Sequence, residues 1–308
     1  MRVLKTAAGE VRDVAFSPDS RAVAAAVAGQ GVFLWNLDLP TIAPVRLEQI
    51  NGGYQPADLR FSADGRQLAW NLTTGRHTYD RDTRNTTSEA FAVLESAITW
   101  RLGADGTRLI SNHGLSDYYL AGWQWKEDEW VRQWHLSTRH LSVSLPTLSP
   151  ASDRFAILTR DTASGRWWEQ PMRLEVRDTA TGAVQTVGTY PYSYAGKLAF
   201  HPNGEQIAGL NDMTLLAWAL PTGADPRLAR NDNRKHFTAL AYHPNGCRLF
   251  VTSNDATVHV FDARSLDRVN RYTWQLDKLS AVAVSPDGTL AAAGSANGDV
   301  VVWDLDDQ

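Results

Sequence analysis

The feature that most constrains this chain is a short turn motif that recurs seven times between apolar stretches. Its clearest copy, Ser285-Pro286-Asp287-Gly288, precedes a run that ends at Val300-Val301-Val302-Trp303-Asp304. Neighbouring copies lie about 40 to 50 residues apart, a spacing typical of repeat architectures. The other copies, in chain order, are Ser17-Pro18-Asp19-Ser20, Ser62-Ala63-Asp64-Gly65, Gly103-Ala104-Asp105-Gly106, Ser149-Pro150-Ala151-Ser152, His201-Pro202-Asn203-Gly204 and His243-Pro244-Asn245-Gly246.

The residue types of the motif explain why the chain should turn there. Proline presets φ at the first corner, Asp or Asn bonds back to the backbone, and Gly accepts a positive φ. Before the turns, large apolar residues alternate with small or polar ones, as in Val14-Ala15-Phe16 and Leu240-Ala241-Tyr242. This period of two predicts strands, and no segment has a sustained helical period. We therefore expect an all-β protein.

Seven units, each with about four short strands, fit the blades of a β-propeller. At these turns and at Trp303-Asp304 the chain resembles the WD-repeat β-propeller family, whose signature is the Trp-Asp dipeptide. The resemblance covers essentially the whole chain, strongly at residues 1–38 and 196–307 and weakly from about 85 to 190. Degraded forms of the dipeptide are Trp35-Asn36, Arg177-Asp178, Trp218-Ala219 and Phe261-Asp262.

The resemblance implies a single domain over residues 1–308, a seven-bladed β-propeller of four-stranded antiparallel blades. The last repeat holds only three strands before Gln308, which would leave an unpaired sheet edge. Arg2-Val3-Leu4-Lys5 can supply the missing outer strand, the usual closure in this family. The family's Gly-His dipeptide is absent, and His236 lies too close to Tyr242 to replace it. We therefore expect the family's buried His-Ser-Asp-Trp network to be missing.

Charge and composition limit the classes of partner. The net charge of −4 and the isoelectric point near 6.1 give no basic excess for tracking phosphates. Cys247 is the single cysteine, and no apolar run approaches the length that spans a bilayer. We expect a cytoplasmic monomer with no nucleic-acid or membrane partner.

Aromatic residues gather where the repeat is least faithful, and they are our candidate site for a protein or peptide partner. The fourth repeat has an insertion at residues 160–171, in the loop between its second and third strands. Exposed Trp and Tyr are enriched at binding hot spots. The alternative is that these residues fold back to plug the channel mouth or to cover a blade. The expected partner-binding residues are Tyr118, Tyr119, Arg166, Trp167, Trp168, Tyr190, Tyr192 and Tyr194.

A second aromatic group surrounds the acidic turn Lys126-Glu127-Asp128-Glu129. The spacing predicts a hairpin in which Trp125 and Trp130 face each other across two strands. Packing on an outer blade face is the simplest interpretation, and a side-surface contact for a partner is the alternative.

Catalysis is not indicated by the residues expected to line the channel. Of the seven equivalent inward positions only Asp13 and Asp58 are carboxylates, whereas calcium needs six to eight oxygen ligands. We therefore predict a non-catalytic interaction scaffold with no metal or cofactor. Two alternatives stay open: a channel-mouth hydrolase or lyase that uses Asp13 and Asp58, and a module that senses a small ligand.

Overall fold

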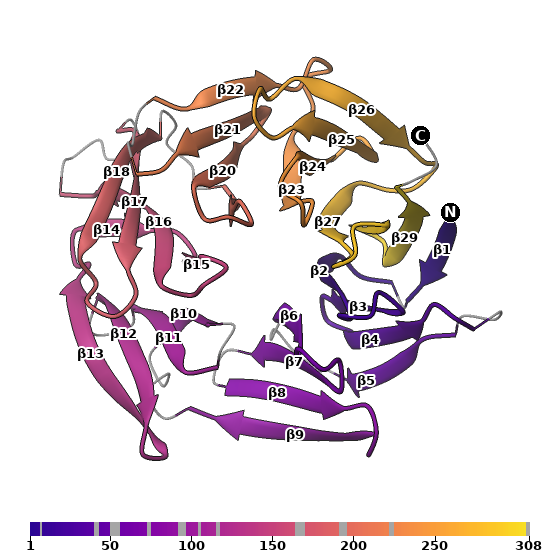
Figure 1. Cartoon of the computed structure of the whole chain (residues 1–308), viewed down its shortest axis with the longest axis horizontal. Helices are drawn as coiled ribbons and strands as arrows, with labels where there is room; N and C mark the ends of the chain where they lie inside the picture. The colour runs from indigo at the N-terminus through magenta and orange to yellow at the C-terminus, as the bar shows by residue number, and fades with distance from the viewer. Residues whose placement is uncertain are drawn as a thin grey trace. The chain divides into compact units, whose positions relative to one another are not determined.

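The computed structural model describes residues 1–6, 8–39, 43–49, 56–72, 75–91, 97–103, 106–114, 118–163, 170–190, 196–221 and 225–305. Over these residues the chain forms strands joined by turns, in seven sheets (Figure 1). None of the described residues belongs to a helix long and apolar enough to cross a membrane. The chain divides into two compact units, which are described separately: unit 1 is Met1–Phe91 with Asn231–Gln308, and unit 2 is Ala92–Arg230. That residues 1–308 form a single domain stays a prediction.

Unit 1 contains four antiparallel sheets, each with strands paired in chain order apart from the last. Blade 1 is β2 (Val11–Phe16), β3 (Ala22–Val27), β4 (Gly31–Asn36) and β5 (Val45–Gln49). Blade 2 is β6 (Ala57–Phe61), β7 (Gln67–Leu72), β8 (Gly75–Asp80) and β9 (Asn85–Ala90). Blade 6 is β23 (Phe237–Tyr242), β24 (Arg248–Ser253), β25 (Thr257–Asp262) and β26 (Arg268–Thr273). Blade 7 is β27 (Leu279–Val284), β28 (Leu290–Ser295), β29 (Asp299–Asp304) and β1 (Arg2–Lys5).

Unit 2 contains three further antiparallel sheets. Blade 3 is β10 (Ala97–Leu102), β11 (Arg108–His113), β12 (Tyr119–Lys126) and β13 (Glu129–Ser137). Blade 4 is β14 (Leu141–Val143), β15 (Thr147–Leu148), β16 (Arg154–Asp161), β17 (Met172–Asp178) and β18 (Val184–Tyr190). Blade 5 is β19 (Leu198–Phe200), β20 (Gln206–Asn211), β21 (Thr214–Ala219) and β22 (Arg227–Arg230).

The first strand of blade 4 is broken in two, because β14 and β15 both pair with β16. The break contains Pro146, which has no amide hydrogen to give to the ladder. Ser144 replaces part of the missing pairing, since its hydroxyl accepts from the backbone N–H of Leu158 at 2.8 Å. Blade 4 therefore keeps four strand positions although it contains five strands.

In all seven copies of the predicted turn the first and fourth residues are hydrogen-bonded, and each copy lies between the first two strand positions of its blade. In every copy the fourth residue donates its backbone N–H to the carbonyl of the first, at 2.8 to 3.0 Å. The fourth residue also has a positive φ in every copy, including Ser20 at 59° and Ser152 at 55°, where the motif lacks glycine. This agreement confirms the repeat as a series of structurally equivalent units.

Side chains complete these turns in the way that the motif predicts. The Ser17 hydroxyl bonds the carboxylate of Asp19 at 2.5 Å, and Ser285 bonds Asp287 at the same distance. The fourth copy has Ala151 at the acidic position, and there Ser149 bonds Asp153 instead at 2.7 Å. The turn is therefore satisfied even in the copy that matches least well in sequence.

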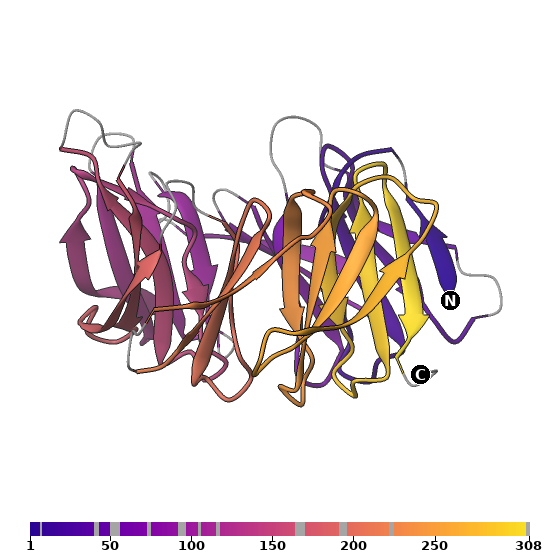
Figure 2. The ribbon, with the colours of Figure 1, turned by 90° about the horizontal axis from the view of Figure 1, so that it is seen from above.

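The predicted closure of blade 7 is confirmed. Strand β1 pairs antiparallel with β29, with Leu4 opposite Val300 and Val3 opposite Val301. Leu4 is 3% exposed and packs in a core cluster with Val11 and Trp35 of blade 1. In Figure 2 strands β27, β28 and β29 run side by side, with their connections at the two ends. The N-terminal strand thus contributes both backbone pairing and apolar burial.

The predicted tryptophan hairpin is also confirmed. Strands β12 and β13 pair with Trp125 opposite Trp130, and the two rings meet edge to face at 5.3 Å. Glu127 and Asp128 make the turn between them, both with positive φ. This geometry is favourable for aromatic pairs, so the hairpin stabilises itself.

Candidate functional site

The insertion of the fourth repeat lies where the sequence predicts it, between the second and third strands of blade 4. Strand β16 ends at Asp161 and β17 begins at Met172, whereas the same connection in blade 1 needs only residues 28–30. The predicted binding residues Arg166, Trp167 and Trp168 lie outside the described residues, as do Tyr192 and Tyr194.

Two of the predicted residues stand together in blade 3, at the equivalent connection between its second and third strands. Tyr118 precedes β12 and is 49% exposed. Tyr119 stacks on His113, with ring centroids 4.1 Å apart and planes 10° apart. Tyr118 is therefore an exposed tyrosine that directly precedes an anchored one, Tyr119.

A buried polar chain holds His113 beneath Tyr119. Trp123 Nε1 donates to the Ser111 hydroxyl at 2.8 Å, and that hydroxyl lies 2.7 Å from His113 Nε2. Burial, with a smaller effect from the Arg132 charge, lowers the pKa of His113 to about 4. The imidazole is therefore neutral at physiological pH. Blade 3 thus contains a buried His-Ser-Trp chain, although we expected such a network to be missing.

Tyr190 lies in the core and not on the surface. It ends β18, is 0% exposed and stacks on Trp218 of blade 5 at 5.9 Å. Its hydroxyl donates to the carbonyl of Leu210 at 2.6 Å. Tyr190 therefore anchors the start of the connection between blades 4 and 5 and cannot itself face a partner in this arrangement.

The two inward carboxylates of unit 1 are engaged in hydrogen bonds with neighbouring protein groups. Asp13 accepts from the backbone N–H of Val14 and, across to blade 2, from that of Leu59, each at 2.9 Å. Asp58 accepts from Arg60 Nε and Asn71 Nδ2, each at 3.0 Å. These bonds give both carboxylates a structural role. Among the described residues, no three His, Cys, Asp or Glu side chains gather as metal ligands would.

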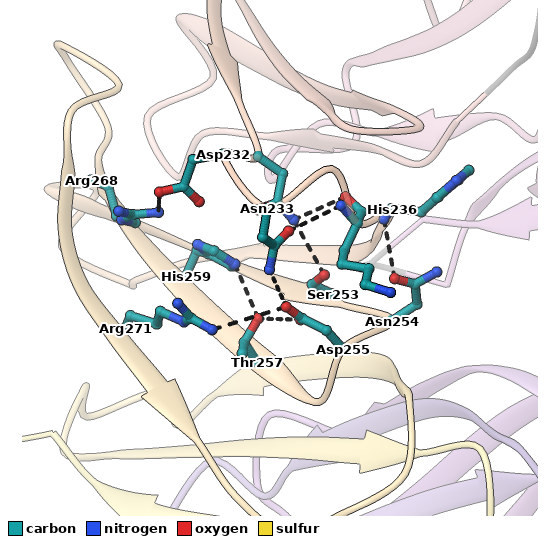
Figure 3. A network of polar contacts seen from close by, with 12 residues as sticks. Asp232, Asn233, His236, Ser253, Asn254, Asp255, Thr257, His259, Arg268 and Arg271 are labelled. Atoms are coloured by element: carbon teal, nitrogen blue, oxygen red, sulfur yellow. Dashed lines mark hydrogen bonds and ion pairs between the residues drawn. The ribbon is translucent and has the colours of Figure 1, made fainter.

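A larger polar network lies in blade 6, where the loop 231–236 meets the turn between β24 and β25 (Figure 3). Asp255 is its centre. The carboxylate accepts from Thr257 Oγ1 at 2.5 Å and from Asn233 Nδ2, and it pairs with Arg271 at 4.0 Å. Burial acts to raise the pKa of Asp255, but hydrogen bonds from Thr257, Ser253 and Asn233 outweigh it and lower the pKa. The carboxylate is therefore ionised, and the positive charge of Arg271 compensates it.

His259 lies beneath this network and is 0% exposed. Its Nε2 lies 3.0 Å from Thr257 Oγ1, and its ring stacks on Phe261 and meets Phe237 edge to face. Burial is the main cause that lowers the pKa of His259, followed by the charge of Arg268. We find its Nδ1 without a hydrogen-bond partner among the described residues.

The sequence contains a signal for this network. His236 lies about three residues too close to Tyr242 to take the place of the family's histidine. Asn233 occupies the earlier position, and its amide reaches Asp255. An amide can donate to a carboxylate as an imidazole does, so asparagine at this position is the signal for the network.

Comparisons with known proteins agree with this geometry. The family model for the WD domain, G-beta repeat, matches residues 1–36, 231–262 and 269–304. Guanine nucleotide-binding protein subunit beta from Oryza sativa subsp. indica is 26% identical over 105 residues, which are 32% of this chain and 28% of that protein. The same subunit from Zea mays matches with the same identity and coverage. The chain thus covers about a quarter of the length of these relatives.

The fold is similar over the full length to a solved structure. The β-propeller domain of Myceliophteria thermophila Cps50 (Swd1) superimposes with a TM-score of 0.74 at 13% identity, covering 99% of this chain and 98% of that one. Seven antiparallel sheets with this similarity define a seven-bladed β-propeller. Blades 1, 6 and 7 match the WD-repeat family model, and the whole chain has the fold of a seven-bladed β-propeller.

Proposed function

We propose that this WD-repeat protein is a non-catalytic interaction platform that binds a peptide or protein partner through the aromatic loops of unit 2. Propellers of this family serve typically as scaffolds for protein interaction, and the curated relatives are subunits of a guanine nucleotide-binding protein. Fold alone does not fix function, so the proposal depends on the aromatic loops themselves.

The observation that carries the proposal is the exposure of Tyr118 directly before the anchored Tyr119. Its neighbour Tyr119 is held on His113, and His113 on Ser111, by contacts in the interior of blade 3. A half-exposed tyrosine has few rotatable bonds, so it loses little conformational entropy when a partner covers it. Aromatic side chains of this kind often contribute about 2 kcal/mol or more at an interface.

We infer that the other aromatic residues enlarge this surface. Trp167 and Trp168 occupy the long connection of blade 4, which is equivalent to the connection that carries Tyr118 in blade 3. Tyr192 and Tyr194 follow Tyr190, whose buried hydroxyl fixes the beginning of their connection. Apolar or cationic side chains of the partner would insert among these rings, with Arg166 at the rim.

The experiment is affinity capture from the native host with the wild type and the Trp167→Ala/Trp168→Ala and Tyr118→Ala variants, followed by titration of the purified partner. Both variants should lose capture with unchanged melting temperatures. Trp125→Ala is the matched control, because Trp125 is an exposed tryptophan at the other end of blade 3. Early unfolding of the double variant would instead support the alternative that the aromatic loops cover the propeller. Equal capture by all variants would exclude this surface.

We infer likewise that the protein acts as a monomer in the cytoplasm. Sedimentation velocity of the purified chain and imaging of a tagged copy in the host test these two points directly.

A further inference from the structure

The loop of residues 231–236 in blade 6 is held along its whole length by hydrogen bonds. Asn231 Nδ2 donates to the carbonyl of Lys235 at 2.9 Å, and the N–H of Lys235 donates to Asn233 Oδ1 at 3.0 Å. The backbone of His236 then pairs with Asn254 in both directions, at 3.0 and 3.1 Å. The loop is therefore preorganised, although five of its six residues are exposed.

The acidic side chains of this region are neutralised within the blade (Figure 3). Asp232 pairs with Arg268 at 2.9 Å. Asp255 pairs with Arg271 and accepts a hydrogen bond from Asn233. The hydrogen bond from Arg268 is the main cause that lowers the pKa of Asp232. Neither carboxylate therefore offers an uncompensated charge to an approaching partner.

The cationic side chains of the loop are not compensated in the same way. Arg234 and Lys235 are both exposed, and among the described residues neither the Arg234 guanidinium nor the Lys235 ammonium forms an ion pair or a hydrogen bond. Arg234 also has a φ of 58°, a left-handed conformation that the bonds of the loop maintain. Arg268 and Arg271 each pair with one of the two carboxylates, so the charges of Arg234 and Lys235 are in excess in this loop. The whole chain, by contrast, has a net charge of −4.

We propose that the loop 231–236 is a docking surface for an acidic segment of a protein partner, rich in Asp and Glu. Charge complementarity of this kind increases the association rate and selects partners, and a preorganised loop lowers the entropic cost of binding. Two uncompensated cations are too few for a nucleic-acid surface, which commonly neutralises about six to ten phosphates. The surface belongs to unit 1, so it is independent of the aromatic loops proposed above.

The test uses the full chain and a fluorescein-labelled peptide rich in Glu and Asp, with the matching Gln and Asn peptide as its neutral control. Fluorescence anisotropy should show binding of the acidic peptide that weakens as salt is added. Arg234→Glu/Lys235→Glu should weaken this binding by about tenfold or more. Arg248→Glu/Arg264→Glu makes the same change of charge at the other end of blade 6 and should leave the affinity unchanged.

Several results would overturn the proposal. These are the absence of binding to the wild type, equal affinity for the neutral peptide, and equal weakening by the two double variants. Tighter binding to phosphatidylserine vesicles or to single-stranded RNA than to the acidic peptide would also overturn it. Should the glutamate variant lose its native melting transition, Arg234→Gln/Lys235→Gln replaces it and should still weaken peptide binding.

Discussion

Trp134 donates its indole N–H to the backbone carbonyl of Thr179 at 2.9 Å, which joins the outer strand of blade 3 to blade 4. The same indole stacks on Phe155 of blade 4 at 5.6 Å, with the two planes 5° apart. Glycines leave room for it, since a Cβ on Gly182 would lie 2.6 Å from the ring and a Cβ on Gly122 only 2.3 Å. One tryptophan thus connects two sheets of unit 2.

The glycine beside this indole provides the first prediction. Gly182→Ala should destabilise the protein by about 2 to 4 kcal/mol, from the clash with Trp134 and the strain of a positive φ. Gly106→Ala is the matched control, because both residues have φ of 71° and no described atom lies within 4 Å of a Cβ at Gly106. Urea denaturation measures both variants. Equal losses of unfolding free energy in the two variants would show that backbone strain alone is responsible.

The second prediction concerns buried indole donors. Trp123 Nε1 finds the Ser111 hydroxyl, but Trp35 and Trp303 have no partner for Nε1 among the described residues. In blade 3 Ser111 lies two residues after Leu109, the strand partner of Trp123. In blade 1 the strand partner of Trp35 is Val23, so the equivalent position is Ala25. Ala25→Ser should therefore supply an acceptor and stabilise the protein by about 1 kcal/mol.

Urea denaturation checks this prediction, with Ala24→Ser as the control. Ala24 is also fully buried, but it lies on the opposite face of β3, so its new hydroxyl would be buried away from the indole and should destabilise. Ser111→Ala is the reverse experiment and should cost about 1 to 3 kcal/mol. If Ala25→Ser destabilised as much as Ala24→Ser, the indole would not be short of an acceptor.

The local part of the fold could be predicted, and the contacts between blades could not. A turn such as Ser285-Pro286-Asp287-Gly288 depends on the dihedral preferences of its own residues. The pairing of β1 could be predicted because the last repeat contains only three strands and needs a fourth. The bond from Trp134 to Thr179 depends on how two sheets pack, which no local pattern specifies.

The candidate site shows the same division. Tyr190 is one of the predicted partner-binding residues, yet the burial of β18 alternates so that Thr186, Gly188 and Tyr190 all face inward. A period of two applied to that strand would have placed Tyr190 in the core. The loop 231–236 of blade 6 is marked in the sequence only by three consecutive basic residues, because the sequence cannot show that Arg268 and Arg271 pair with the neighbouring carboxylates.

The third prediction is a loss of stability between pH 6.5 and 4 that depends on His113. Burial lowers the pKa of His113 in the folded protein to about 4, from an ordinary value of 6.5. Over this range the unfolded chain binds a proton that the folded protein excludes, so stability is complete above pH 6.5 and falls as the pH decreases. The loss should reach roughly 2 to 3 kcal/mol.

Urea denaturation at a series of pH values compares the wild type with His113→Gln, which should have a flatter profile over this range. His135→Gln is the control, because His135 is exposed on β13 and its replacement should leave the profile unchanged. Identical profiles for all three proteins would contradict the assignment to His113.

The last prediction concerns the N-terminal strand that completes blade 7. Removing residues 1–8 should lower the melting temperature sharply, because β29 loses its pairing partner and Leu4 leaves the core. Leu4→Ala isolates the apolar part and should cost about 2 to 4 kcal/mol. Val3→Ala, on the same strand at a side chain 42% exposed, should cost much less. Differential scanning calorimetry compares the three proteins with the wild type, and a truncated chain that melts normally would show that β1 is dispensable.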